Sequence, residues 1–128
     1  MKHEKAVALG MAPAPAAFDF AGHWKNELNS TMELTVVGDV VTGTYTSAVS
    51  GTGQQIVGPI TGFASGRIIS FVVNWPNASI TAWVGHAVTE AGADIIETLW
   101  HLATVMPKPA DPDELWESVL AGADRFHR

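Results

Sequence analysis

From Gly22 onward, the sequence consists of short segments rich in Val, Ile, Thr, Trp and Tyr, separated by Gly, Asn, Asp and Pro. This succession is typical of an all-β sandwich or barrel, because β-branched and aromatic side chains suit strands and the separating residues favour turns. The spacing predicts eight strands, over Gly22–Leu28, Met32–Val37, Val40–Val49, Ile56–Gly62, Ile68–Trp75, Ser79–Ala87, Ile95–Thr104 and Val119–His127.

The connections between these predicted strands are short. Gly38-Asp39 and Ser65-Gly66 have the composition of hairpin turns, and Pro76-Asn77 and Ala91-Gly92 predict similar reversals. Consecutive strands joined in this way favour an antiparallel up-and-down barrel. The one helical candidate, Asp111–Glu117, begins with an aspartate and a proline, which favour helix starts, and would form a short turn before the last strand.

Side chains alternate between the two faces of a strand, and here one face mixes tryptophans with hydroxyls. This face carries Tyr45, Ser47 and Val49 in the third strand; Phe71, Val73 and Trp75 in the fifth; Ser79, Thr81 and Trp83 in the sixth; and Ile96, Thr98, Trp100 and Leu102 in the seventh. A dry core would avoid the hydroxyls, because each one buried without a partner costs about 1–3 kcal/mol. A solvated face would avoid the aromatics. The pattern therefore predicts a cavity with apolar walls and a few polar groups for one small ligand, which an eight-stranded barrel can hold.

Composition limits the other classes of function. The 128 residues suit one domain, and 47% hydrophobic with 16% charged residues allow a buried core. The formal charge of −6 argues against nucleic acid as a partner. No apolar run reaches the length of about 18 residues that a membrane span needs. The absence of cysteine excludes disulfides, thiolate metal sites and cysteine nucleophiles.

The first 20 residues form a Pro/Ala-rich leader, which we expect to be loosely ordered, before a barrel domain at residues 21–128. Lys2 and Lys5 followed by an apolar, small-residue stretch resemble a signal peptide. Gly10, Pro13 and Pro15 interrupt that stretch, so the signal is not a clear one.

Two blocks of sequence resemble the avidin and streptavidin family. Residues 22–31, GHWKNELNST, are similar to the family pattern G-x-W-x-N-x-x-G-S, which places Asn26 and Ser30 at ligand-contacting positions, with Asn29 in place of the usual glycine. Residues 42–49, TGTYTSAV, look like the family's T-G-x-Y-x-S-A-V and place Tyr45, Ser47 and Val49 at the site.

The resemblance continues to the C-terminus. It places Trp75, Ser79, Thr81, Trp83, Trp100 and Leu102 in the cavity wall, together with an aspartate, Asp124, that faces a ligand ring nitrogen. Trp116, eight residues before Asp124, resembles the tryptophan lent to a neighbouring subunit. After Val49, the loop Ser50–Gln55 lacks the asparagine that is usual in the family.

The resemblance implies non-catalytic binding of biotin, with no metal or other cofactor. Asn26, Ser30 and Tyr45 would donate to the ureido oxygen, and Asp124 and Ser47 would accept from the ureido N–H groups. The tryptophans would enclose the rings and tail, while Ser79 and Thr81 would meet the sulfur and the valerate carboxylate. The resemblance also implies a secreted or periplasmic protein and a homo-oligomer, a tetramer with a dimer as the alternative.

Other functions are weaker predictions. A glycosidase needs two converging carboxyls, but alternation directs Glu27 and Glu97 away from the ligand face and leaves Asp124 alone. No histidine shares the inward face with Ser47 or Ser79, and His86 and His101 fall on the outer face, without metal-ligand spacing. A lipocalin-like carrier of another small apolar ligand, and an interaction or inhibitor barrel with a filled core, remain open.

The alternation of side chains along a strand, which we call parity, also predicts an apolar outer surface on the last two strands. Ile95, Glu97 and Leu99 of one strand, and Val119, Ala121 and Ala123 of the next, should point out of the barrel. A monomeric barrel would normally show polar groups to water at such positions. We therefore expect a neighbouring barrel to cover this face.

Overall fold

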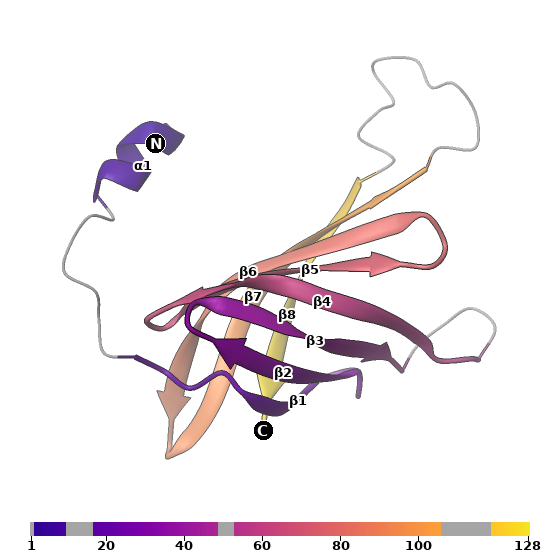
Figure 1. Ribbon diagram of the computed structural model, residues 1–128, viewed down its shortest axis with the longest axis horizontal. Helices are drawn as coiled ribbons and strands as arrows, with labels where there is room; N and C mark the ends of the chain where they lie inside the picture. The colour runs from indigo at the N-terminus through magenta and orange to yellow at the C-terminus, as the bar shows by residue number, and fades with distance from the viewer. Residues whose placement is uncertain (1, 10–16, 49–52, 106–118) are drawn as a thin grey trace.

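The computed structural model describes residues 2–9, 17–48, 53–105 and 119–128, and its strands form one closed antiparallel barrel in sequence order (Figure 1). The eight strands are β1 Gly22–Asn26, β2 Thr31–Val37, β3 Val40–Ser47, β4 Ile56–Ser65, β5 Ile68–Trp75, β6 Ser79–Glu90, β7 Ala93–Thr104 and β8 Val119–His127. Each strand pairs with the next, and β8 returns to β1. The predicted fold class, an eight-stranded up-and-down barrel, is confirmed.

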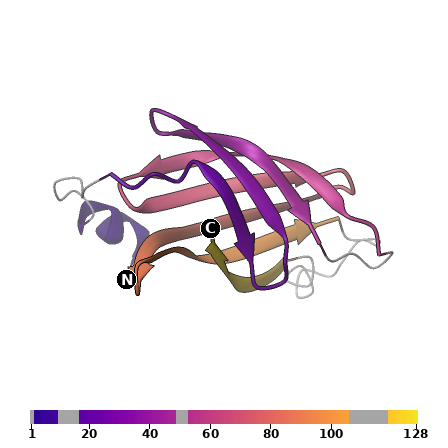
Figure 2. The same ribbon diagram turned by 90° about the horizontal axis from the view of Figure 1, so that it is seen from below.

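Closure of the barrel depends on a short ladder. β1 pairs with β8 only through Lys25↔His127 and Asn26↔Phe126, whereas β6 and β7 pair over their full lengths from Ser79↔Thr104 to Glu90↔Ala93. Figure 2 shows the two terminal strands meeting at this seam. The seam brings Asn26, from the start of the barrel, close to the last strand and so helps to assemble the site described below.

Tight turns join the strands, as the composition predicts. Ala91 and Gly92, between β6 and β7, both have positive φ, 49° and 80°, as a two-residue hairpin turn with the right-handed twist of the flanking strands requires. The turn between β4 and β5 is Gly66-Arg67, one residue later than predicted, because Ser65 still pairs with Ile68.

The inner faces form one apolar core, which extends from Phe20 and Trp24 to Tyr45 and Trp83 in the cavity described below. Trp24 is fully buried there, and its Nε1–H donates to the backbone oxygen of Phe20 at 2.9 Å. The Arg128 guanidinium lies 4.2 Å from the Trp24 ring centroid, a cation–π contact, and donates to Ala21 O at 3.0 Å. Phe18 packs edge-on to Phe20 at 4.7 Å, so the segment just before β1 closes one end of the barrel.

One helix, α1 His3–Leu9, precedes the barrel and was not predicted from the sequence. None of its residues is buried, so its sequence has no amphipathic pattern from which the helix could be predicted. The helical turn predicted at Asp111–Glu117 lies outside the described residues. Within the described part of the chain, no helix has the length and apolarity to cross a membrane.

Candidate functional site

The barrel encloses a cavity of about 330 Å³ near one end. Its lining consists of Asn26, Leu28, Ser30, Tyr45, Ser47, Trp75, Thr81, Trp83, Trp100, Leu102 and Asp124. A second hollow of about 200 Å³ shares Ser47, Trp75, Thr81 and Leu102 with it and adds Ile56, Asn77 and Ser79. Every predicted site residue that the structure describes therefore lines one of these two hollows. Val49 and Trp116, also predicted, lie outside the described residues.

The amide of Asn26 is fixed by its neighbours. Its Oδ1 accepts hydrogen bonds from the backbone N–H groups of Leu28 at 3.0 Å and Ser30 at 2.9 Å, which leaves Nδ2 as the donor, and Nδ2 donates to the Tyr45 hydroxyl at 3.2 Å. This tight turn requires Asn29 to take a φ of 66°, a conformation that asparagine tolerates better than most residues. Asn29, which stands where the family usually has glycine, can therefore form this turn.

Ser30 and Tyr45 complete a cluster of hydroxyls beside Asn26. The Ser30 Oγ accepts from Ala48 N at 3.1 Å, so its own proton is available to another acceptor. Burial, together with the charge of Asp124, raises the pKa of the Tyr45 phenol above its ordinary value, although a hydrogen bond with Ser30 opposes this. The phenol therefore stays protonated at physiological pH. The three side chains can together present O–H and N–H donors to one ligand oxygen.

Asp124, on β8, lines the same cavity and is only 8% exposed. Its Oδ2 accepts the indole N–H of Trp83 at 2.8 Å, and its backbone oxygen accepts the Thr98 hydroxyl at 3.1 Å. Its pKa is raised from 3.8 to about 6, mainly by burial and also by the nearby Glu27 carboxylate, while hydrogen bonds from Trp83 and Asn26 oppose the rise. Asp124 is therefore mostly an anionic acceptor at neutral pH.

Asp124 is the one carboxyl among the described residues that line the cavity, as alternation predicts. Glu27 does not line the cavity. It lies on the outer side of the barrel, where its Oε2 accepts the backbone N–H of Arg125 at 3.0 Å. Glu97 also faces outward and pairs with Arg125 at 3.3 Å.

The aromatic side chains form a stack and a wall. Trp83 is stacked between Tyr45 and Phe71, with ring centroids 4.9 Å apart on each side. Trp83 is only 3% exposed, so it forms the floor of the cavity. Trp75 meets Tyr45 edge-on at 5.6 Å, and its Nε1–H donates to Thr81 Oγ1 at 2.8 Å, which fixes the plane of this wall.

Trp100 lies directly over Gly122 of the neighbouring strand. A Cβ at Gly122 would fall 2.5 Å from Trp100 Cζ2, closer than real Cβ atoms approach a ring atom. The two residues are register partners on β7 and β8, so a larger residue here would push the indole off the strand. The missing side chain of Gly122 therefore gives Trp100 its place in the cavity wall, a relationship that the sequence pattern does not reveal.

At the mouth, the Ser79 hydroxyl donates to Asn77 Oδ1 at 2.6 Å. Asn77 was predicted as a turn residue, not as part of the site. Its turn, between β5 and β6, folds over the hollow, so its amide reaches Ser79 and adds a polar group where a ligand would leave the barrel.

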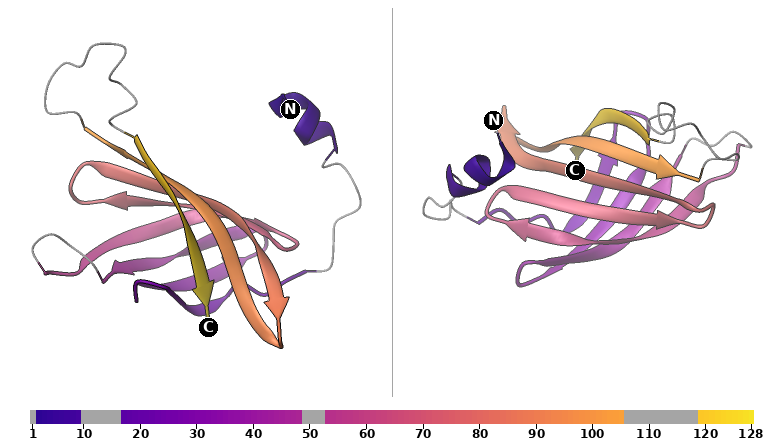
Figure 3. Two further views of the ribbon diagram at one scale, coloured as in Figure 1. Left: turned by 180° about the vertical axis from the view of Figure 1, so that it is seen from behind. Right: turned by 90° about the horizontal axis from the view of Figure 1, so that it is seen from above.

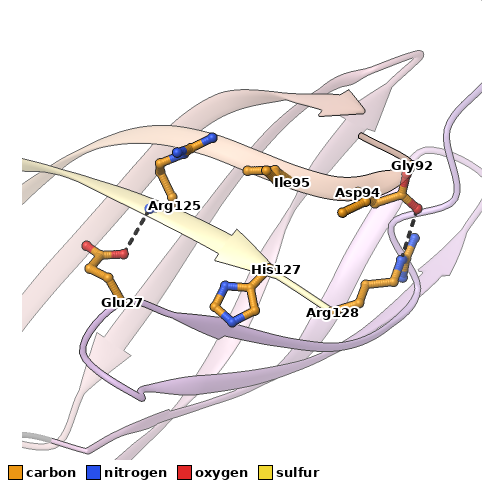
Figure 4. A pocket seen from close by; sticks show the side chains of 8 residues that line it. Glu27, Gly92, Asp94, Ile95, Arg125, His127 and Arg128 are labelled. Carbon is orange, nitrogen blue, oxygen red and sulfur yellow. Dashed lines mark hydrogen bonds and ion pairs between the residues drawn. The ribbon is translucent and has the colours of Figure 1, made fainter. Parts of the chain in front are cut away.

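A larger hollow, of about 690 Å³, lies elsewhere, on the outer side of the seam between β1, β7 and β8 (Figure 4). Its charged side chains are paired: Arg128 contacts Asp94 at 3.3 Å, and Glu27 accepts the backbone N–H of Arg125 at 3.0 Å. It combines neither tryptophans nor hydroxyls. The barrel interior is therefore the better candidate for a ligand site.

The described residues contain no group of three His, Cys, Asp or Glu side chains that could hold a metal ion. His86 and His101 are exposed on the outer face, as parity predicts. The interior cavity thus offers hydrogen bonds and apolar contact to a ligand.

A closed barrel with an aromatic cavity and a few converging polar groups defines a small-molecule-binding β-barrel protein. Comparison with known proteins makes this more specific. The sequence matches the profile described as the Avidin family over residues 14–128, and the chain therefore belongs to the avidin family.

Solved structures of similar proteins agree with this assignment. Xenavidin is 30% identical, with a TM-score of 0.76 over 88% of this chain and 98% of its own. A biotin-binding protein from chicken is 29% identical, with a TM-score of 0.74 over 86% and 95% of the two chains. The rhizavidin–biotin complex is 30% identical, with a TM-score of 0.71 over 86% and 95%. The sequence has no significant match among curated protein sequences.

Proposed function

We propose that this protein binds biotin non-covalently and without chemical change, in the cavity inside the barrel. The observation that carries the proposal is the pairing of a donor cluster, Asn26, Ser30 and Tyr45, with a buried acceptor, Asp124, within tryptophan walls. A cyclic urea has one carbonyl oxygen and two N–H groups, and so needs converging donors on one side and acceptors on the other.

In this arrangement the ureido oxygen receives hydrogen bonds from the donor cluster, and the ureido N–H groups donate to Asp124 and Ser47. The bond to Asp124 is charge-assisted and therefore roughly twice as strong as a neutral one. Trp75, Trp100 and the floor residue Trp83 contact the rings and the aliphatic tail. Ser79 and Thr81, with Asn77 beside them, face the sulfur and the carboxylate end.

Two similar proteins support this ligand by name: rhizavidin, solved with biotin, and the chicken protein described as biotin-binding. The lining of the cavity supports binding without catalysis. Among the described residues that line it, Asp124 is the one carboxyl and no histidine is present. A carboxyl pair or a Ser-His-Asp arrangement would need further groups there.

Isothermal titration calorimetry with biotin tests the proposal, with a retinoid and a fatty acid as comparison ligands. We expect saturable binding of one biotin per chain and no comparable heat from the other two. Ligand that binds only the folded state should also raise the melting temperature, since a thousandfold excess over Kd contributes about 4 kcal/mol. A melting curve unchanged by biotin would contradict the proposal, and binding of retinoid or fatty acid instead would favour a lipocalin-like carrier.

We also infer that the barrel forms a homo-oligomer, with a tetramer favoured over a dimer. Val84, Leu99 and Ala123 are register partners across β6, β7 and β8, and all three are exposed on the outer face. Figure 3 shows these strands side by side across one side of the barrel. The family resemblance assigns Trp116 to a neighbour's ligand, which would make the assembly part of the site.

A further inference from the structure

The seam between β1 and β8 is the shortest ladder in the described part of the barrel, and the candidate site is built across it. Its register pairs are Lys25↔His127 and Asn26↔Phe126. Asn26 belongs to the donor cluster, and Asp124, two residues before Phe126 on β8, is the buried acceptor. A ligand that bonds to both therefore connects the two strands at the point where their own pairing ends.

Two side chains hold the strands together beyond the ends of this ladder. At the end of the barrel that the segment before β1 closes, the Arg128 guanidinium donates to Ala21 O at 3.0 Å. At the cavity end, Oε2 of Glu27, the residue after β1, accepts the backbone N–H of Arg125 at 3.0 Å (Figure 4). The Glu27 carboxylate thus takes the place of a backbone carbonyl as the acceptor of a strand N–H.

Glu27 also lies inside the turn that carries the donor cluster. The Asn26 Oδ1 accepts hydrogen bonds from the N–H groups of Leu28 at 3.0 Å and Ser30 at 2.9 Å, and Asn26 N donates to Ser30 O at 2.9 Å. Residues 26–30 therefore form one hydrogen-bonded unit. Through this unit, the bond from Glu27 to β8 fixes the donors Asn26 and Ser30 relative to the acceptor on β8.

The β8 side of this bond is the firmer one. The ladder between β8 and β7 spans the whole of β8. On the outer face, the Arg125 guanidinium lies 3.0 Å from the Glu90 carboxylate and 3.3 Å from that of Glu97, which ties β8 to β6 and β7. Loss of the Glu27 bond should therefore loosen the turn at residues 26–30 and leave β8 in place.

We propose that Glu27 is a positioning residue, whose carboxylate clamps the turn at residues 26–30 to β8 and so slows the escape of a ligand that spans the seam. The inference rests on the proposed function, because the ligand must bond to the donor cluster on one side and to Asp124 on the other. Opening of the seam separates these groups. By linkage the effect is reciprocal, so a bound ligand should also oppose the opening of the seam.

Three variants separate the hydrogen bond of Glu27 from its charge. Glu27→Ala removes both. Glu27→Gln removes the charge, but its amide oxygen can still accept from the Arg125 N–H. Glu27→Asp keeps the charge on a side chain that is one methylene shorter and should not reach β8. Glu90→Ala is the matched control, since it removes another carboxylate that contacts Arg125 and leaves the bond to the backbone N–H intact.

The experiment measures the release of tritium-labelled biotin at neutral pH after excess unlabelled biotin is added. We expect E27A and E27D to release it roughly two- to tenfold faster than the wild type, the range that one ordinary hydrogen bond supports. E27Q should recover most of the retention, and E90A should match the wild type. Equal rates for E27A and the wild type would overturn the inference. Equally fast release by E27A and E27Q would also overturn it, because the effect would then belong to the charge.

Amide hydrogen exchange of the ligand-free protein tests the clamp without biotin. The N–H groups of Asn26 and Ser30 should exchange faster in E27A than in E27Q, and if E27A does not fold, E27D against E27Q makes the same comparison. Equal exchange in the compared variants would refute the clamp, whatever the ligand. Failure of the wild type to bind biotin would instead refute the proposed function.

Discussion

The indole Nε1–H of Trp83 donates to Asp124 Oδ2 at 2.8 Å, and both residues are buried. The hydrogen bond joins β6 to β8 across the inside of the barrel, while the same indole ring lies between Tyr45 and Phe71. One tryptophan therefore serves both as the apolar floor of the cavity and as the group that holds its acceptor in place.

Trp83→Phe should separate these two roles. Phenylalanine can keep the stacking but cannot donate to Asp124, and a hydrogen bond to a charged group contributes about 1.5–3 kcal/mol. We expect biotin to bind at least tenfold more weakly, as measured by calorimetry, and the pKa of Asp124 to rise. Trp24→Phe is the control, because it removes an indole hydrogen bond at the closed end and should lower the melting temperature without changing affinity.

Asp124→Ala should weaken biotin binding by about 2–4 kcal/mol while the barrel still folds, because a ligand N–H group would be buried without its charged acceptor. Competition with a labelled biotin measures the loss, and circular dichroism monitors the fold. Asp94→Ala, which removes an aspartate from the outer face, should bind like the parent. Wild-type affinity in the Asp124 variant would show that the ligand does not reach this carboxyl.

The raised pKa of Asp124 predicts the sign of a stability change in the ligand-free protein. The folded state binds this proton more tightly than the unfolded state, so stability falls as pH rises from 3.8 to about 6. The difference corresponds to about 3 kcal/mol. Other groups titrate too, including Glu27 in the opposite sense, so the measurement is urea unfolding of the wild type against Asp124→Asn at each pH. The wild type should lose stability relative to this variant across that interval, and a constant difference would contradict the prediction.

The sequence predicts most of the fold and of the cavity because alternation is a local property. Tyr45, Ser47, Thr81 and Trp100 could be assigned to one face by parity, and the structure brings them together around one cavity. Glu27, just past the end of β1, also stays out of the cavity, as alternation predicts.

Two other features depend on contacts between segments that parity cannot place. Asn77 reaches the mouth because its turn folds over the hollow, and Trp100 has room because Gly122 faces it across the β7–β8 ladder. Neither relationship has a local sequence signal. The helix α1 went unpredicted for a different reason, since it buries no side chain.

Gly122→Ala should disturb the cavity through Trp100. The added methyl group would lie 2.5 Å from the indole, so the ring must move, and we expect weaker biotin binding with a smaller loss of stability. The double variant Gly122→Ala/Trp100→Ala tests the cause. Without the indole the methyl group meets no obstacle, so the two substitutions should be strongly non-additive in a double-mutant cycle. Additive effects on affinity would place the cause elsewhere.

The last prediction concerns assembly, and it begins from the row formed by Val84, Leu99 and Ala123 on the outside of the barrel. Val84 is 56% exposed and Leu99 is 63% exposed, although they lie side by side in the middle of the longest ladder. The next row along these strands, His86, Glu97 and Arg125, is charged but internally paired, so it can approach another protein surface at limited cost.

A charge at the centre of the apolar row should therefore separate the subunits. Leu99→Glu would bury an unpaired carboxylate in a symmetric contact twice, whereas Thr35→Glu adds the same charge to the exposed face of β2, away from the row. By light scattering we expect the wild type and T35E to have the mass of a tetramer, or at least of a dimer, and L99E to have a smaller mass.

Because the resemblance makes Trp116 part of a neighbour's site, L99E should also bind biotin more weakly. A monomeric mass for the wild type at micromolar concentration, with and without biotin, would refute the assembly; equal masses for wild type and L99E would place the interface on another face.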